Sequence, residues 1–259
     1  MNNFAVLSKK EFDQMIRELK IIWLPVVFML LGLMQPITMY YLPVILEKLG
    51  GVEGILIDPT MARPEGSEVL ASTLSSQFDQ LGIIILVVAV MSVIQAEKAN
   101  GMLAFILTRP VSVSSYIGSK IMTHYLLTIF SIALGYAVSY GYTAYLFTSV
   151  PIPQAILAFI LYCIWLLFLI TLVTMLSTFF NSPAFIALVG IVVLLLCQMT
   201  AGLHPFITAL NPAGISLRAS SILVTGSMGD WWEVNIVATI LIVLGMTLTI
   251  HYWIVKKKF

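Results

Sequence analysis

A long stretch without charged side chains constrains the fold of this chain more than any other feature. From Ile121 to Leu217 the sequence contains no Asp, Glu, Lys or Arg. Over all 259 residues, 60% are hydrophobic and 10% are charged, whereas a soluble domain carries about 25% charged residues. Since roughly 20 apolar residues cross a bilayer as a helix, the charge-free stretch alone accommodates about three spans. A transmembrane β-barrel would alternate polar and apolar residues, and these runs do not. We therefore predict an all-α polytopic membrane protein.

The apolar runs predict six transmembrane helices in a single domain, residues 1–259. The first span contains three prolines and should be kinked. The expected spans cover about residues 21–46, 75–96, 116–147, 154–180, 183–203 and 234–255. Residues 47–74 form the predicted outer loop. Residues 204–229 are broken by Pro205, Pro212, Gly214 and Arg218, so we expect an outer re-entrant segment there rather than a full span.

The basic residues orient these spans. With both termini in the cytoplasm, only three of the 13 Lys and Arg residues, Lys48, Arg63 and Arg218, lie outside. This excess of inner positive charge follows the positive-inside rule. The net charge of +1 therefore averages two differently charged faces, and we expect no nucleic-acid partner. The bilayer is the expected environment.

The N-terminal residues 1–20 predict a helix that lies in the membrane interface. Ser8 and Glu11 match the capping-box pattern that begins a helix. One apolar face and one basic face follow, as in interfacial amphipathic helices. A cleavable signal peptide would carry its apolar core earlier, and a solvated cytoplasmic helix is the alternative. The apolar face consists of Phe12, Met15, Ile16 and Leu19.

A cytoplasmic segment, residues 97–120, joins the second and third predicted spans. Its apolar residues follow the spacing of an amphipathic helix, and Phe105 and Leu107 lie outside the stripe. Pro110 should end this helix, because it lacks an amide donor and disfavours helical geometry at Arg109. Two readings are open: a connector packed on neighbouring spans, or a helix that docks into a partner protein. The stripe consists of Ala99, Met102, Leu103 and Ile106.

Motifs of soluble enzymes are missing from the sequence. It has neither a G-x-x-x-x-G-K-[ST] phosphate loop nor an H-E-x-x-H metal motif, so ATP binding in the usual way and a metalloprotease site are excluded. The three histidines are far apart, and Cys163 and Cys197 fall within predicted spans, where cysteine usually acts as a small apolar residue. We predict no catalytic, cofactor or metal site in this chain.

Asp79 is the one acidic residue expected within a span, and intramembrane acids are candidate functional groups. Its predicted place near the outer boundary also fits a hydrated interface position. Small residues at steps of four, Ala133, Ala137 and Gly141, predict close helix packing on the third span. That packing could lie within the chain or between subunits.

The connector and the order of elements resemble the permease subunit of type-2 ABC exporters. Asn211 and Pro212, before the last span, also resemble the family. Met102 stands where threonine is common, and residues 112–114 lack an arginine often found after the proline. The matching connector residues are Glu97, Gly101, Met102, Leu103, Ile106, Leu107, Thr108, Pro110, Gly118 and Lys120.

This resemblance implies a coupling helix that seats in a groove of a separate cytoplasmic ABC ATPase. ATP and Mg would bind that partner, so this chain would not be an enzyme. A second copy, or a related permease, would complete the pathway, with Asp79, Asn211 and Pro212 as candidate pathway or gate residues. The protein would reside in the plasma (inner) membrane of a bacterium. The implied ATPase contacts are Glu97, Lys98, Gly101, Leu103, Phe105, Ile106, Leu107, Arg109 and Pro110.

Two other classes share parts of this pattern. A secondary transporter would show internal repeats and ionisable groups at mid-membrane, and the sequence offers neither. A membrane immunity or assembly protein would share the topology without an ATPase contact. The substrate stays open: a lipid, a hydrophobic peptide or a drug would each suit uncharged, aromatic-lined spans.

Overall fold

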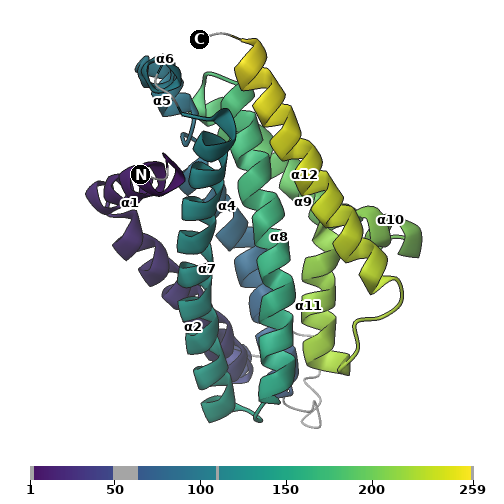
Figure 1. Ribbon diagram of the computed structural model, residues 1–259. Coiled ribbons are helices and arrows are strands. Elements are labelled where there is room, and N and C mark those ends of the chain that lie inside the picture. Colours follow the sequence, from purple (N-terminus) through teal and green to yellow (C-terminus); the bar gives the residue numbers. More distant parts are fainter. Residues whose placement is uncertain (1–2, 49–63, 109–110, 258–259) are drawn as a thin grey trace.

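The computed structural model describes residues 3–48, 64–108 and 111–257. Every regular element in these ranges is helical, and six helical runs are long and apolar enough to cross a membrane. Figure 1 shows these runs packed side by side as one bundle. The predicted all-α fold with six transmembrane helices is confirmed.

Six runs form the spans, and the second of them is composite. The spans are α2 (Lys20–Lys48); the series α3 (Gly66–Ser72), η1 (Thr73–Gly82), α4 (Ile83–Val90) and α5 (Gln95–Ala99); and then α7 (Val113–Leu146), α8 (Ile152–Phe179), α9 (Pro183–Thr200) and α12 (Trp232–Lys256). The remaining helices are α1 (Asn3–Arg17), α6 (Met102–Leu107), α10 (Pro205–Leu210) and α11 (Ala213–Thr225). Helix α2 continues through its three prolines.

The second span begins at Gly66, earlier than the expected Ser75, so residues 66–74 are helical rather than part of the outer loop. Gly66 makes a close packing contact at the start of this span. Its amide donates to the Thr148 hydroxyl at 2.8 Å, and a Cβ there would lie 1.9 Å from the Thr148 carbonyl oxygen. A residue with a side chain would push the two segments apart.

Helices α2 and α7 cross with their backbones in contact. A Cβ on Gly32 would lie 2.0 Å from the carbonyl oxygen of Gly135, and a Cβ on Gly135 would lie 2.3 Å from that of Phe28. In a bilayer such close approach allows the van der Waals packing that holds spans together. The predicted stripe on α7 does not form this crossing: Ala137 is exposed, and a Cβ on Gly141 would meet nothing within 4 Å. Packing of the stripe between subunits stays a prediction.

Helix α8 forms the centre of the bundle. Trp165, Leu166, Leu169 and Val173 are all fully buried, and α8 packs against α7, α9, α11 and α12. The outer segment 204–229 contains α10 and α11. At 1.5 Å per residue, the 13 residues of α11 extend about 20 Å, less than the ~30 Å hydrocarbon core.

Helix α1 lies across the bundle beside α7, at the end that also carries α5, α6 and the last turn of α12 (Figure 1). We call this end the α6 end. Six crossings place all these elements on one side of the membrane. Helix α1 begins at Asn3, so Ser8 and Glu11 lie inside the helix, and the predicted capping box is wrong.

The predicted apolar face of α1 is divided. Met15 is buried, whereas Phe12, Ile16 and Leu19 are each at least half exposed. Glu11, a charged residue, is buried beside Met15. The helix therefore contacts the bundle through a mixed face and leaves its aromatic and aliphatic side chains outward, where a bilayer can cover them.

Candidate functional site

The connector between the second and third spans is two short helices rather than one. Helix α5 ends at Ala99, and Gly101 adopts a left-handed backbone with φ of 68° before α6 begins. Glycine reaches this region without steric cost. The expected continuous stripe fails for this reason, because the turn at Gly101 changes the helix phase and leaves Ala99 and Met102 exposed.

Helix α6 divides its side chains between the protein and the surroundings. Leu103 and Ile106 are buried, whereas Met102 is 45% and Phe105 is 56% exposed. The exposed pair lies at i and i+3, so it forms one apolar face. Arg109, Pro110 and the side chain of Leu107 lie outside the part of the chain that the structure describes.

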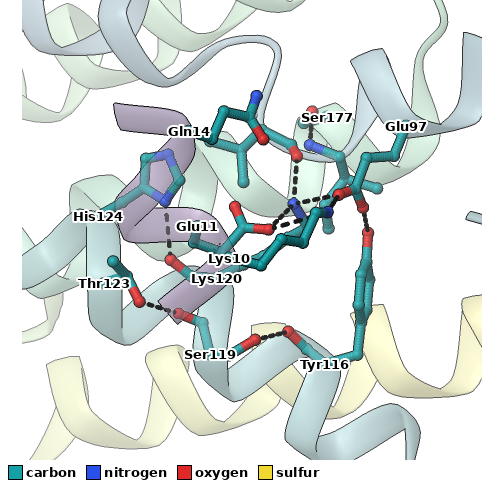
Figure 2. Close-up of polar contacts among 12 residues, drawn as sticks. Lys10, Glu11, Gln14, Glu97, Tyr116, Ser119, Lys120, Thr123, His124 and Ser177 are labelled. Carbon is teal, nitrogen blue, oxygen red and sulfur yellow. Dashed lines mark hydrogen bonds and ion pairs between the residues drawn. The ribbon is translucent and has the colours of Figure 1, made fainter. Parts of the chain in front are cut away.

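Glu97 does not point away from the protein. It is buried in an ion cluster at the α6 end, which we define as Lys10 and Glu11 of α1, Glu97 of α5, and Tyr116 and Lys120 of α7 (Figure 2). The Lys120 ammonium lies 3.0 Å from a Glu11 oxygen and 3.2 Å from a Glu97 oxygen. The cluster holds two positive and two negative side chains, so its formal charge is zero.

The remaining contacts satisfy the buried charges. Tyr116 donates its hydroxyl to Glu97 at 2.5 Å, and Lys10 forms an ion pair with the same carboxylate. Lys120 also donates to the Val93 carbonyl at 2.9 Å. A buried charge is tolerated when it is paired and hydrogen-bonded in this way. Three elements distant in sequence, α1, α5 and α7, are thereby held together at one point.

Lys10 is the most exposed charge of this cluster. Burial by itself would lower the pKa of Lys10, but the hydrogen bond and the charge of Glu97, with a further contribution from Glu11, outweigh it and raise the pKa. Lys10 therefore stays charged at neutral pH.

The other side of α5 is fixed to the end of α8. Lys98 donates to the carbonyls of Thr178 and Phe180 at 2.8 and 2.7 Å, where unpaired carbonyls end a helix and attract a cation. The Ser177 hydroxyl accepts from the amides of Ile94 and Gln95 at 3.0 and 2.9 Å. Glu97 and Lys98 thus anchor the connector to the bundle from two sides.

Sequence reasoning missed Lys10 and Tyr116 as partners of Glu97, and it missed Glu11 as a partner of Lys120. Lys120 was visible as the last charge before the long charge-free stretch, and such a charge at the edge of a span needs a partner. The partner of Lys120 on α1 could have been sought among the carboxylates of the N-terminal helix. The spacing of these carboxylates does not show that Glu11 is the partner.

Asp79 lies inside the protein and not at a hydrated boundary. It is buried within η1 and accepts from the Tyr162 hydroxyl at 2.9 Å, the Trp165 indole nitrogen at 3.2 Å and the Ser216 hydroxyl. The expected interface position is wrong because the second span begins earlier than predicted. Asp79 therefore links η1, α8 and α11. A π-helical stretch such as η1 often marks a functional position.

Asn211 and Pro212 form the junction between α10 and α11. Asn211 donates to the Cys197 carbonyl at 2.7 Å and to the Thr200 hydroxyl at 3.0 Å, and its side-chain oxygen accepts from the Ala213 amide at 3.0 Å. Pro212 directly precedes α11. The pair therefore ties the end of α9 to the start of α11.

A second asparagine, which sequence reasoning missed, completes this junction. Asn235 of α12 is fully buried and donates to the carbonyls of Thr208 and Asn211 at 3.0 and 2.8 Å. Its oxygen accepts from Arg218 at 3.3 Å. The outer segment is therefore fixed to the last span as well. The Asp79 and Asn211 contacts share no residue with the ion cluster and do not join it in one site.

Two comparisons with known proteins bear on these sites. Residues 5–252 match the family model described as "ABC-2 family transporter protein". The chain is also 34% identical, over 245 residues, to the "Uncharacterized transmembrane protein YxlG" of Bacillus subtilis (strain 168), a match that covers 94% of each chain.

Proposed function

Because the chain belongs to the ABC-2 family of transporter proteins, we propose that it is the membrane permease subunit of an ATP-driven exporter. Membership of this family establishes that the chain is a membrane protein of a transporter. Coupling to a separate ATPase, the direction of transport and a paired permease are the parts that we propose. Its place is the plasma membrane, with both termini and α6 on the cytoplasmic side, as the distribution of Lys and Arg indicates.

One observation carries the coupling proposal: an apolar face at the α6 end is exposed. Met102 and Phe105 of α6 belong to it, and Val6 of α1 is 47% exposed beside them. With Leu7 and Ile106 these side chains line a groove of about 460 Å³ between α1 and α6. An exposed apolar patch that is surrounded by charged residues is typical of a protein–protein contact.

The anchoring of the connector supports a mechanical role for it. A force applied to α6 passes into α5 and reaches α7 through the ion cluster and α8 through Lys98. In this proposal Phe105 and Met102 touch the ATPase, while Glu97, Lys98, Leu103 and Ile106 hold the connector in place. ATP and Mg bind the partner, and this chain contributes no catalytic residue.

The outer half of the molecule supplies candidates for the pathway. Asp79, Asn211 and Pro212 connect α11 to the second, fourth, fifth and sixth spans. Movement of the spans would therefore reposition α11. We propose that Asp79 and the Asn211–Pro212 junction set the position of α11 as a gate, with a second permease completing the path.

Purification of the chain from its native membranes tests this function. An ATPase that carries a phosphate-loop motif should copurify, and its rate of ATP hydrolysis should rise when the exported compound is added. Lipids, hydrophobic peptides and drugs are the compounds to screen. A purified, folded permease without such an ATPase would contradict the proposal and favour a membrane immunity or assembly protein.

A further inference from the structure

A second groove borders α1 on the side away from α6. It lies between α1 and α7, has a volume of about 720 Å³, and is also lined by Ile21 at the start of α2. We call it the α1–α7 groove. Helix α1 contributes one face and α7 contributes another. Its lining residues are Phe4, Ser8, Lys9, Phe12, Ile21, Met122, Thr123, Leu126, Leu127 and Phe130.

The walls of this groove are almost wholly hydrocarbon. Phe12, Leu126 and Phe130 are each at least half exposed, and they lie on a membrane-embedded bundle rather than in its core. From Met122 to Phe130 the wall extends about 12 Å along α7 at 1.5 Å per residue. That length approaches half of the ~30 Å hydrocarbon core, which is the depth of one leaflet.

Two polar groups at the α1 side of the groove have no partner within the part of the chain that the structure describes. The Ser8 hydroxyl is buried and makes no hydrogen bond. Lys9 is exposed and forms no ion pair there, whereas its neighbour Lys10 pairs with Glu97, and Lys20 pairs with Glu18. Thr123, by contrast, is satisfied by the Ser119 carbonyl at 2.7 Å. A buried hydroxyl without a partner is costly.

We propose that the α1–α7 groove binds one anionic phospholipid of the leaflet that α1 borders. An acyl chain lies along α7 between Met122 and Phe130, the phosphate pairs with Lys9, and an ester or phosphate oxygen accepts from Ser8. Each unexplained feature then has a partner of the right chemistry. The proposal depends on the membrane embedding of the chain and not on the ATPase.

Photo-crosslinking in nanodiscs tests this site on the full chain. The probes are phosphatidylglycerol and phosphatidylcholine that carry the same diazirine-labelled acyl chain, and peptide mass spectrometry measures labelling of residues 4–12 and 122–130. We expect phosphatidylglycerol to label these peptides about fivefold more, since one lysine near anionic lipid contributes ~1 kcal/mol, and 1.4 kcal/mol is tenfold.

Two variants distinguish specific lipid binding in the α1–α7 groove from unspecific contact with the surrounding lipids. Lys9→Gln should reduce the labelling ratio between the two lipids to about one. Ser8→Ala should lower labelling by both lipids alike, because both carry the ester and phosphate oxygens that Ser8 would bind. Arg17→Gln removes a basic residue from the same helix that does not line this groove and should leave the ratio unchanged. Equal labelling by both lipids in the unmodified chain, or an equal loss in Lys9→Gln and Arg17→Gln, would overturn the proposal. Labelling absent from both peptides would overturn it as well, because protein would then cover the groove.

Discussion

Lys120 joins two carboxylates that come from opposite sides of it, one on α1 and one on α5. Its side chain is 1% exposed, so water cannot replace it as a partner. At the scale of single residues, the cohesion of the α6 end depends on this ammonium group more than on any exposed pair.

Lys120→Met should therefore destabilise the protein strongly. Removal of one partner from a buried ion pair typically costs about 3–5 kcal/mol, because it leaves charge buried without compensation. Thermal unfolding of the purified protein in detergent measures the loss. Lys20→Met is the control: Lys20 pairs with the more exposed Glu18 at 2.6 Å, and exposed pairs contribute about 0–1 kcal/mol. Equal losses in the two variants would contradict the role given to Lys120.

Asp79 offers a second test at this scale. Asp79→Leu leaves three donors, on Tyr162, Trp165 and Ser216, without their acceptor, at about 1–3 kcal/mol for each unsatisfied group. Asp79→Asn keeps one acceptor oxygen for Tyr162 and Trp165, so it should cost far less and leave assembly intact, with a modest change in transport. The melting temperatures of both variants measure this. If Asn is as damaging as Leu, the negative charge itself is required.

These residues also show what sequence reasoning reaches at this scale. Glu97 and Asp79 stand out because charges are rare in apolar runs. Their partners could not be found, since Tyr162 and Ser216, which bind Asp79, and Tyr116, which binds Glu97, carry no local signal. A hydrogen bond between residues far apart in the chain depends on helix packing that spacing does not encode.

At the scale of elements, the α2–α7 crossing depends on two glycines without side chains. Gly135→Ala places a Cβ against the Phe28 carbonyl and should cost about 1–3 kcal/mol, as overpacking does. Gly141→Ala, on the same helix with nothing within 4 Å of the added Cβ, should be neutral or stabilising, since alanine favours helix by about 1 kcal/mol. Unfolding of both variants measures the difference, and its absence would show that the helices separate freely.

At this scale the sequence predicts the spans well and their contacts poorly. Six spans follow from the apolar runs of the sequence, because a backbone that crosses a bilayer has to satisfy its hydrogen bonds within helical structure. The close contact of α7 with α2 uses Gly135 and not the predicted small residues Ala133, Ala137 and Gly141, whose packing between subunits stays a prediction. The break in the connector at Gly101 was missed because a stripe of apolar residues does not show where a left-handed turn interrupts it.

At the scale of the whole molecule, the topology gives the two ends different environments. With Cys163 and Cys197 replaced by serine, single cysteines at Asp13 and Lys257 should react with an impermeant maleimide only from the cytoplasm, and one at Ser227 only from outside. These positions are exposed. Labelling of Asp13 and Lys257 from opposite sides would contradict an even number of crossings.

The central claim is that the exposed face of α6 docks on an ATPase. Phe105→Asp places on that face a charge that must lose its water without gaining a partner, at a cost of several kcal/mol (about 3–5). The control Asn100→Asp adds the same charge at an exposed position of the same connector without changing the apolar face.

Copurification of the ATPase with each variant, normalised to folded permease, is the deciding measurement. We expect Phe105→Asp to insert and fold normally but to lose the ATPase and export together, while Asn100→Asp retains most of both. Phe105→Asp with full ATPase binding and full transport, or with a loss of permease stability instead of binding, would contradict the account.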